Sequence, residues 1–404
     1  MRPNASRIGS HLQAADLRGI GRLAIDATLG LTDLVENLHH NILRVPSPLG
    51  TPSEQPTTGL TGFVYRSIRG VTRLVGSSVD VLLGQISALL GPAQSSPSME
   101  REAVLSAING VLGDHLAASG NPLAIHMHLR HDRQPIAIDR AVLAERIAQP
   151  SGRVLVLLHG LCMNPLQWKC YGEHDHGAVL AAEGGFTPLY LQYNSGLHIV
   201  DNGRQFAEQM QALHDAWPVP VEEIVLLCHS MGGLVARSAC DQAAPRGDAW
   251  ITRLTKIAFL GTPHLGARLE RGGHWIDVLL GASPYTAAFA RLGRLRSAGI
   301  TDLRHGSVRR HDRPDVRAKQ VPLPAGVACY ALAGALSDEP GGLRDKLFGD
   351  GLVTVDSALG RHRLKSHRLD FPPEHQWVGQ GIDHLALLGR EEVMVQLRQW
   401  LLPR

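Results

Sequence analysis

The sequence is poor in cysteine and in long apolar runs. Its five cysteines are an odd number for a chain of 404 residues, and none of them forms a C-x-x-C pair. A disulfide-stabilised secreted domain is therefore not expected, and the predicted compartment is the reducing cytoplasm. The amino-terminal stretch also lacks the apolar core of a signal peptide. No run of about 18 uncharged apolar residues occurs, so no membrane-spanning helix is expected.

Charge is equally scarce. Charged residues make up 19% of the chain, lysine occurs only five times, and the net charge is +3. A net charge this small gives no argument for a nucleic-acid partner. Apolar residues make up 44%, which is enough for a large core. The length and composition together predict one large domain with an appendage, and they specify no oligomeric state.

The appendage is expected over residues 1–120, as a helical extension with linkers rich in proline and serine. Residues 1–45 and 63–90 have apolar side chains at helical spacing, and residues 102–116 read as one more helix. In residues 63–90, Arg66, Arg69 and Arg73 share a different face from the apolar stripe. That helix either packs on the main domain or lies as a basic amphipathic helix on a membrane surface, so peripheral membrane contact through the N-terminal helices stays open.

The period of the apolar residues changes at the start of the second region, which is predicted to be an α/β domain over residues 121–404. Apolar and polar residues alternate from Leu123 to Leu129, as in a half-buried strand, and residues 135–138 would be its hairpin partner. The histidines at positions 126, 128 and 131 would lie close together there. With no acidic or cysteine ligand beside them, they are interpreted as residues of a solvent-facing strand, and no metal is expected.

Buried strands and helices then alternate along the chain. Four short apolar runs are predicted as strands, at residues 154–158, 189–193, 254–260 and 327–333. Helices are predicted at residues 177–182 and 200–217. This alternation is typical of an α/β protein with a doubly wound, mostly parallel sheet. The long, arginine-rich and weakly periodic stretch at residues 264–325 is predicted to be an inserted cap or lid.

The most informative stretch covers residues 224–235. An apolar strand, Ile224 to Leu227, is followed by Cys228-His229-Ser230-Met231-Gly232 and then by a helix-forming run. A strand, a sharp turn with serine at its apex and a helix make up the nucleophile elbow of the G-x-S-x-G pattern. Cys228 stands where the first glycine of that pattern is usual; cysteine is small and tolerates burial, so the turn can still form.

A serine nucleophile in this layout needs an acid and then a histidine later in the chain. The candidate acid is Asp350, which has glycine on both sides and follows the strand predicted at residues 327–333. Its competitors are Asp338, Asp356 and Asp383, and a plain D-G turn is the structural alternative.

The candidate base is His384, the last histidine of the chain. It follows the last predicted strand, at residues 369–371, and precedes the final helix. His375 is the other histidine in reach of this order. The oxyanion donors are expected to be the backbone N–H groups of Met231 and Leu161. Supporting roles are assigned to His159, Gly160, His229 and Gly232.

Five motifs occur in the order found in α/β-hydrolase-fold bacterial lipases and esterases. They are His159-Gly160-Leu161, His229-Ser230-Met231-Gly232-Gly233, Gly261-Thr262-Pro263-His264-Leu265-Gly266, Asp350-Gly351-Leu352-Val353 and Asp383-His384-Leu385. The chain also resembles the hydrolase domain of inositol deacylases that act on glycosylphosphatidylinositol. The resemblance covers roughly residues 120–404, and it implies a triad of Ser230, Asp350 and His384 with Leu161 and Met231 at the oxyanion hole.

Two departures limit what the resemblance implies. Cys228 replaces a glycine, and Ala386 stands where many such lipases carry a calcium-binding aspartate, so neither calcium nor any cofactor is expected. The predicted function is hydrolysis of carboxylic esters, of acyl lipids or other small apolar esters, through an acyl-enzyme. The alternatives are an acyltransferase or amidase with the same triad, and a non-catalytic member that docks on membranes.

Overall fold

The computed structural model describes residues 18–19, 21–22, 99–169, 175–267, 297–309, 320–337 and 349–402. The chain divides into two compact units, one of residues 1–101 and 116–124 and the other of residues 102–115 and 125–404. Apart from residues 18–19 and 21–22, the helices predicted within 1–45 and 63–90 lie outside the described residues. The division at residue 120 and the lid over residues 264–325 stay predictions. No helix in the described part of the chain is long and apolar enough to cross a bilayer.

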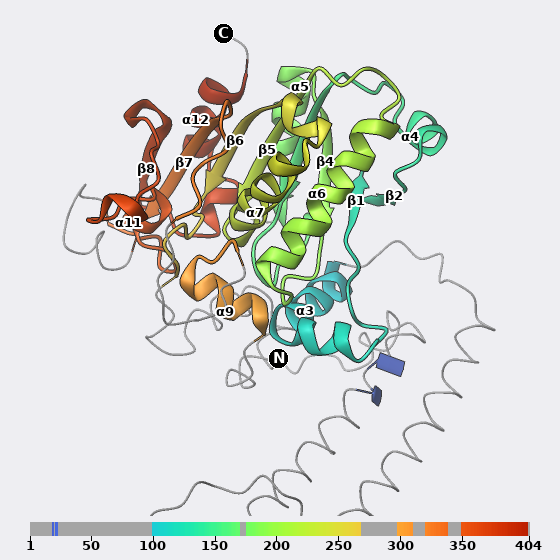
Figure 1. Ribbon diagram of the computed structural model, residues 1–404, viewed down its shortest axis with the longest axis horizontal. Helices are drawn as coiled ribbons and strands as arrows, with labels where there is room; N and C mark the ends of the chain where they lie inside the picture. The colour runs from blue at the N-terminus through green and yellow to red at the C-terminus, as the bar shows by residue number, and fades with distance from the viewer. Residues whose placement is uncertain are drawn as a thin grey trace, which may run out of the picture. The chain divides into compact units, whose positions relative to one another are not determined.

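The larger unit is built on one sheet of eight strands (Figure 1). The strands are β1 (His128–His131), β2 (Gln134–Ile136), β3 (Arg153–Leu158), β4 (Thr187–Gln192), β5 (Glu223–His229), β6 (Leu254–Leu260), β7 (Ala328–Ala335) and β8 (Gln376–Gln380). They are ordered β2-β1-β4-β3-β5-β6-β7-β8. Strands β3 to β8 pair in parallel, and β1 is antiparallel to both neighbours. The predicted doubly wound, mostly parallel sheet is confirmed.

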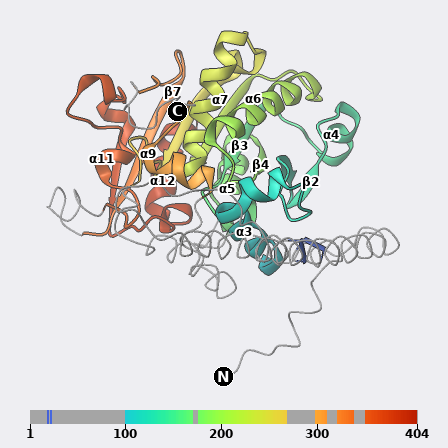
Figure 2. The same cartoon turned by 60° about the horizontal axis from the view of Figure 1, so that its bottom comes forward.

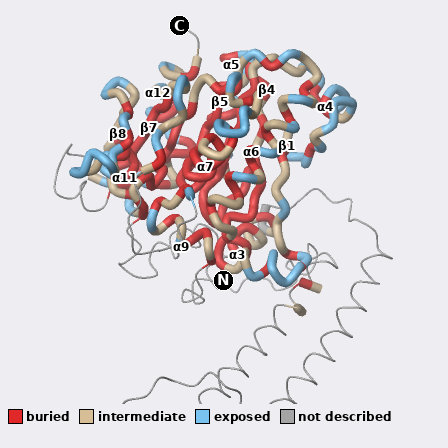
Figure 3. Tube along the Cα trace, viewed as in Figure 1, coloured by how far each residue is buried: buried red, intermediate tan, exposed pale blue. Residues whose placement is uncertain are grey.

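Helices cover both faces of this sheet. The helices of the described part of the chain are α3 (Met99–Ala118), α4 (Arg140–Arg146), α5 (His176–Gly184), α6 (Ile199–Ala216), α7 (Met231–Arg246), α9 (Ala298–His305), α11 (Val355–Ala358) and α12 (Glu391–Leu401). Alternate residues of β3 belong to two core clusters: Val154 and Val156 pack with α6 and α7, whereas Leu155 and Leu157 pack with α5 and α12. After Arg153 the strand is apolar because both of its faces are buried, as the red central strands of Figure 3 show.

The last strand was predicted at residues 369–371, and this prediction is wrong. Strand β8 lies at Gln376–Gln380. Leu369 and Phe371 are only 4% and 5% exposed, so they are apolar because they fill the core from a loop. The Leu369 N–H donates to the Gly360 carbonyl instead of to a neighbouring strand. Two prolines follow Phe371, and a proline has no N–H to donate to a sheet.

Residues 102–115 of α3 belong to the sheet-containing unit. The Asn194 side chain donates to the Gly113 carbonyl at 2.9 Å, and the Ser297 hydroxyl donates to the Gly110 carbonyl at 2.6 Å. A methyl group on Gly110 would collide with Cys162, which lies in the loop after β3. This part of α3 therefore packs on loops that follow the carboxyl ends of β3 and β4, beside the start of α9 (Figure 2).

Candidate active site

Ser230 occupies the predicted sharp turn between β5 and α7. Its backbone has φ +52° and ψ −121°, a conformation that L-residues adopt only when their surroundings impose it. The Ser230 N–H donates to the Leu260 carbonyl at 2.8 Å, which ties the turn to the carboxyl end of β6. The side chain is 6% exposed. Strand, strained serine turn and helix follow one another as the sequence predicts.

Close packing explains the small residues around the turn. A methyl group on Gly232 would lie 2.5 Å from the Leu158 carbonyl oxygen and 2.7 Å from that of His159. Only glycine lets α7 start this close to the end of β3. Cys228 is fully buried in β5, and burial raises the pKa of its thiol well above the usual value. The neutral thiol therefore acts as a small apolar side chain where glycine is usual.

His384 and Asp350 form a buried pair. His384 Nδ1–H donates to Asp350 Oδ2 at 2.7 Å, and the two side chains are 3% and 1% exposed. The other carboxylate oxygen accepts the N–H groups of Leu352 at 3.0 Å and Val353 at 2.7 Å. The His384 N–H also donates to the Asp350 carbonyl at 3.1 Å. These bonds fix the orientation of the carboxylate and of the imidazole that it contacts.

The same pair lies beside the serine turn. A methyl group on Gly261, directly after β6, would be 3.0 Å from the His384 ring. His229, the neighbour of Ser230, donates from Nε2 to the His384 carbonyl at 2.9 Å, and the two rings lie 4.7 Å apart. Asp350 packs against Gly334 of β7. Ser230 and His384 therefore both lie near the carboxyl end of β6, and Asp350 lies beside β7.

The competing acids and the competing base lie elsewhere. Asp383 is exposed and accepts the N–H groups of residues 385 and 386, both at 2.9 Å, so it caps a short turn. Asp356 is exposed in the first turn of α11, and Asp338 lies outside the described residues. His375 donates from Nδ1 to the Cys329 carbonyl at 3.1 Å and packs on Tyr330.

The two expected oxyanion donors flank the serine. A methyl group on Gly160 would be 3.1 Å from both Ser230 Cβ and His229 Nδ1, so the loop after β3 touches the elbow. Met231 is the first residue of α7, where backbone N–H groups have no partner inside the helix. Among the described residues, neither the Met231 nor the Leu161 N–H donates to a hydrogen-bond acceptor. Both are therefore available to bind an anion.

His159 makes structural hydrogen bonds at the base of that loop. Its Nδ1–H donates to the Gly160 carbonyl at 2.8 Å, and its ring stacks on Tyr193 with centroids 4.3 Å apart. The Tyr193 hydroxyl donates to the His159 carbonyl at 2.7 Å. Burial lowers the pKa of His159 to about 4, so the ring is neutral near pH 7.

Sequence reasoning missed one residue that supports this region, Arg237 of α7. Its guanidinium is 1% exposed and donates to His264 Nδ1 at 3.4 Å, to Gln320 Oε1 at 3.2 Å and to the Val321 carbonyl. Burial lowers its pKa to about 10. Arg237 thus joins the segment after β6 to residues 320–321. A lone arginine in an otherwise apolar helical run was the signal that could have identified it.

The predicted histidine group on β1 makes ordinary strand contacts. His131 donates from Nδ1 to the Pro188 carbonyl at 3.0 Å, and His128 donates from Nδ1 to the His126 carbonyl at 2.9 Å. In the part of the chain that the structure describes, no group of three or more His, Cys, Asp or Glu side chains is placed to hold a metal ion.

Three buried histidines predict a strong dependence of stability on pH. Burial lowers the pKa of His159 to about 4, and it lowers those of His229 and His264 well below the usual 6.5. Below pH 6.5 the unfolded chain binds protons that the folded chain does not, so the free energy of unfolding falls as the pH drops towards 4. For His159 alone the full loss is about 3 kcal/mol.

Urea denaturation at about pH 7.5 and about pH 5 measures this effect. His159→Asn keeps a donor near the Nδ1 position without a titratable ring, so it should make the loss between the two pH values smaller. Equal stability of the unmodified chain at both pH values would contradict the prediction.

The central part of this chain is similar to a described protein family. Residues 149–317 match the family described as PGAP1-like alpha/beta domain. Over these residues the chain is similar to PGAP1-like α/β domains. The matched residues of the PGAP1-like domain include β3 to β6, the loop with Leu161 and the Ser230 elbow. Asp350 and His384 lie beyond the match. A comparison with curated protein sequences gave no significant match.

Solved structures with related folds are distant. A Bacillus licheniformis lipase, BlEst2, is 17% identical with a TM-score of 0.42, and the match covers 69% of this chain and 98% of that one. A Pyrococcus furiosus esterase, Pf2001, is 14% identical with a TM-score of 0.36 over 62% and 82% of the two chains. Legionella pneumophila phospholipase PlaB is 16% identical with a TM-score of 0.35, over 51% and 45%.

Proposed function

We propose that this protein is a serine hydrolase of carboxylic esters, with Ser230 as nucleophile, His384 as general base and Asp350 as its partner. The observation that carries the proposal is the buried 2.7 Å hydrogen bond between His384 and Asp350, next to a serine held at φ +52°. A buried acid–imidazole pair beside a strained serine turn is the arrangement that ester hydrolysis through an acyl-enzyme needs.

Each residue of the proposed triad has one task. Ser230 Oγ attacks the acyl carbon while His384 Nε2 takes the hydroxyl proton. Asp350 holds Nδ1–H, which leaves Nε2 free to accept that proton, and it stabilises the imidazolium that results. The N–H groups of Met231 and Leu161 bind the oxyanion, each worth about 3 kcal/mol of transition-state stabilisation. His384 then gives the proton to the leaving alcohol, and water hydrolyses the acyl-enzyme by the same route.

A fluorophosphonate probe tests the nucleophile, because such probes phosphonylate an activated serine hydroxyl. We expect labelling of the folded protein at Ser230, located by peptide mass spectrometry, and no labelling of a Ser230→Ala variant. Ser238, which lies in the same helix and donates from Oγ to the Val308 carbonyl, provides a matched control as Ser238→Ala. Labelling that persists in Ser230→Ala, or its absence in folded wild-type protein, would refute the assignment.

Apolar esters, including acyl lipids, are the proposed substrates. The support is the apolar, arginine-rich sequence of residues 264–325, which follows β6 at the end of the sheet where Ser230 lies. Hydrolysis of p-nitrophenyl esters of increasing chain length measures the preference. We expect kcat/KM to rise from acetate to octanoate, since each buried methylene favours binding by about 0.8 kcal/mol. A strong preference for acetate would exclude this substrate class.

A further inference from the structure

An unusually basic and exposed loop precedes β8. Residues 361–368, here called the basic loop, carry four permanent positive charges and two histidines in eight positions. The charged residues are Arg361, Arg363, Lys365 and Arg368, and all four are exposed. Leu364, at the centre of the loop, is 59% exposed, more than any other large hydrophobic residue among those described. This concentration contrasts with a net charge of +3 for the whole chain.

Local hydrogen bonds hold the basic loop in shape. The Arg368 guanidinium donates from Nε and Nη2 to the His362 carbonyl at 3.3 and 3.2 Å, and the Leu364 N–H donates to His362 Nδ1 at 3.0 Å. The side chains of Arg363 and Lys365 make no hydrogen bond within the described residues. The exposed leucine is therefore presented on a fixed turn between two cations that are not paired to any described residue.

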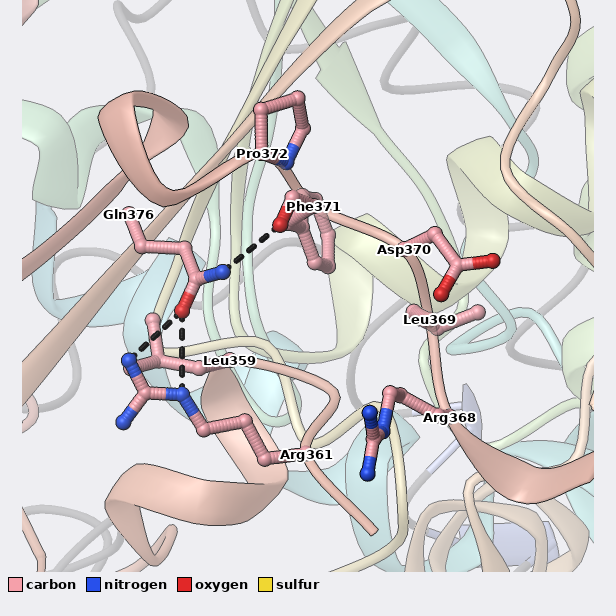
Figure 4. Close-up of a pocket in the computed structure, with 8 residues that line it drawn as sticks. All are labelled: Leu359, Arg361, Arg368, Leu369, Asp370, Phe371, Pro372 and Gln376. Carbon is pink, nitrogen blue, oxygen red and sulfur yellow. Dashed lines mark hydrogen bonds between the residues drawn. The ribbon is translucent and has the colours of Figure 1, made fainter. Parts of the chain in front are cut away.

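A pocket of about 500 Å³ lies beside the basic loop (Figure 4). Its lining combines two cations of the loop with one carboxylate, one amide and four apolar residues: Leu359, Arg361, Arg368, Leu369, Asp370, Phe371, Pro372 and Gln376. Arg361 donates from Nε and Nη2 to Gln376 Oε1 at 3.0 and 2.7 Å, which fixes the orientation of its guanidinium. Leu359, Leu369 and Phe371 are almost fully buried, so the two arginines make the accessible lining suited to an anionic group.

The basic loop is tied to the end of the sheet that carries His384. The Gln320 N–H donates to the Ser366 carbonyl at 3.2 Å, and the Gln320 side chain donates to the His264 carbonyl at 2.6 Å. His264 belongs to the segment that begins with Gly261, which contacts the His384 ring. A surface that binds the loop would therefore also lie towards the carboxyl ends of the strands.

We propose that the basic loop docks the protein on a bilayer that contains anionic phospholipid, with Leu364 inserted between head groups. The positive charges favour anionic lipid over neutral lipid. Each one or two basic residues near the surface should raise the partition coefficient onto anionic vesicles about tenfold. The exposed leucine favours a bilayer over other polyanions, because only a bilayer offers an apolar phase. Asp370 is the one carboxylate in the pocket lining, against two arginines. The proposal does not depend on the proposed ester hydrolysis.

Vesicle co-sedimentation of the full chain tests the proposal, with phosphatidylcholine vesicles and with vesicles that also contain phosphatidylserine. We expect binding only with phosphatidylserine, and a partition coefficient lowered at least about tenfold in Arg363→Glu/Lys365→Glu. Leu364→Ser should weaken binding severalfold and leave its salt dependence unchanged, because it removes apolar contact and no charge.

The control variant is Arg146→Glu/Arg253→Glu, which changes the net charge by the same amount at exposed positions before β3 and β6, at the opposite end of the sheet. It should keep most of the binding. Equal binding by the loop variant and the wild type would overturn the proposal, and so would equal losses in the two charge variants. A preference for a DNA duplex over the anionic vesicles at the same salt would also overturn it.

Discussion

Replacing Asp350 with asparagine should lower kcat for ester hydrolysis by about 10⁴-fold while the protein stays folded. The asparagine oxygen can keep the bonds from the Leu352 and Val353 N–H groups, because Asp350 Oδ1 accepts both. Its NH₂ group then faces His384 Nδ1, where in the wild type Oδ2 accepts a hydrogen bond from Nδ1–H at 2.7 Å. A donor there forces the imidazole proton onto Nε2, which can no longer take the proton of Ser230.

Steady-state hydrolysis of a p-nitrophenyl ester, with circular dichroism as the check on folding, measures this loss. Asp383→Asn is the matched control, because Asp383 is the neighbour of His384 and its oxygen only caps a turn. That variant should keep activity within a fewfold of the wild type. Full activity of Asp350→Asn would show that the base does not depend on Asp350.

Replacing Glu102 with alanine should lower the free energy of unfolding by about 3–5 kcal/mol. Arg130 Nη2 donates to both carboxylate oxygens of Glu102 at 3.1 Å, and the side chains are 5% and 9% exposed. Loss of the carboxylate leaves a buried guanidinium without a counter-charge. Urea denaturation measures the change, and Glu102→Leu combined with Arg130→Met should recover most of it because no unpaired charge remains.

An exposed ion pair gives the comparison. Arg204 and Glu208 pair at 3.1 Å on α6, with side chains 50% and 55% exposed. Glu208→Ala should cost no more than about 0.5 kcal/mol, since solvent screens that pair. Similar losses of unfolding free energy in Glu102→Ala and Glu208→Ala would mean that burial does not set the strength of the Glu102–Arg130 ion pair.

The parts of the fold that were predictable from sequence are those set by one strong local pattern. The buried parts of β3 and β6, Val154 to Leu158 and Ile257 to Leu260, are apolar because both faces of the sheet are covered there. The serine elbow is bounded by small residues that close packing requires. Strand β8 was placed too early because Phe371 and Leu369 have the apolar character of a strand but reach the core from a loop. A short apolar run in the sequence does not show whether its residues belong to a strand or to a loop that packs into the core.

The order of the site residues along the chain was also predictable, but their surroundings were not. The sequence points to Ser230, Asp350 and His384 because the fold requires that order. Nothing in a local pattern indicates that Arg237, on the helix after the elbow, reaches His264 and residues 320–321. Contacts between segments this far apart depend on how helices pack on the sheet, and single-sequence patterns do not record that.

Helix α3 has a practical consequence for anyone preparing a shortened recombinant protein. Cutting the gene at residue 121 would delete the turns whose Gly110 and Gly113 carbonyls bind Ser297 and Asn194. The loop with Cys162, which follows Leu161, would lose its contact with Gly110. The Cys162 thiol, which is buried in the full chain, would then be exposed to oxidants. A fragment beginning ahead of residue 99 retains those turns.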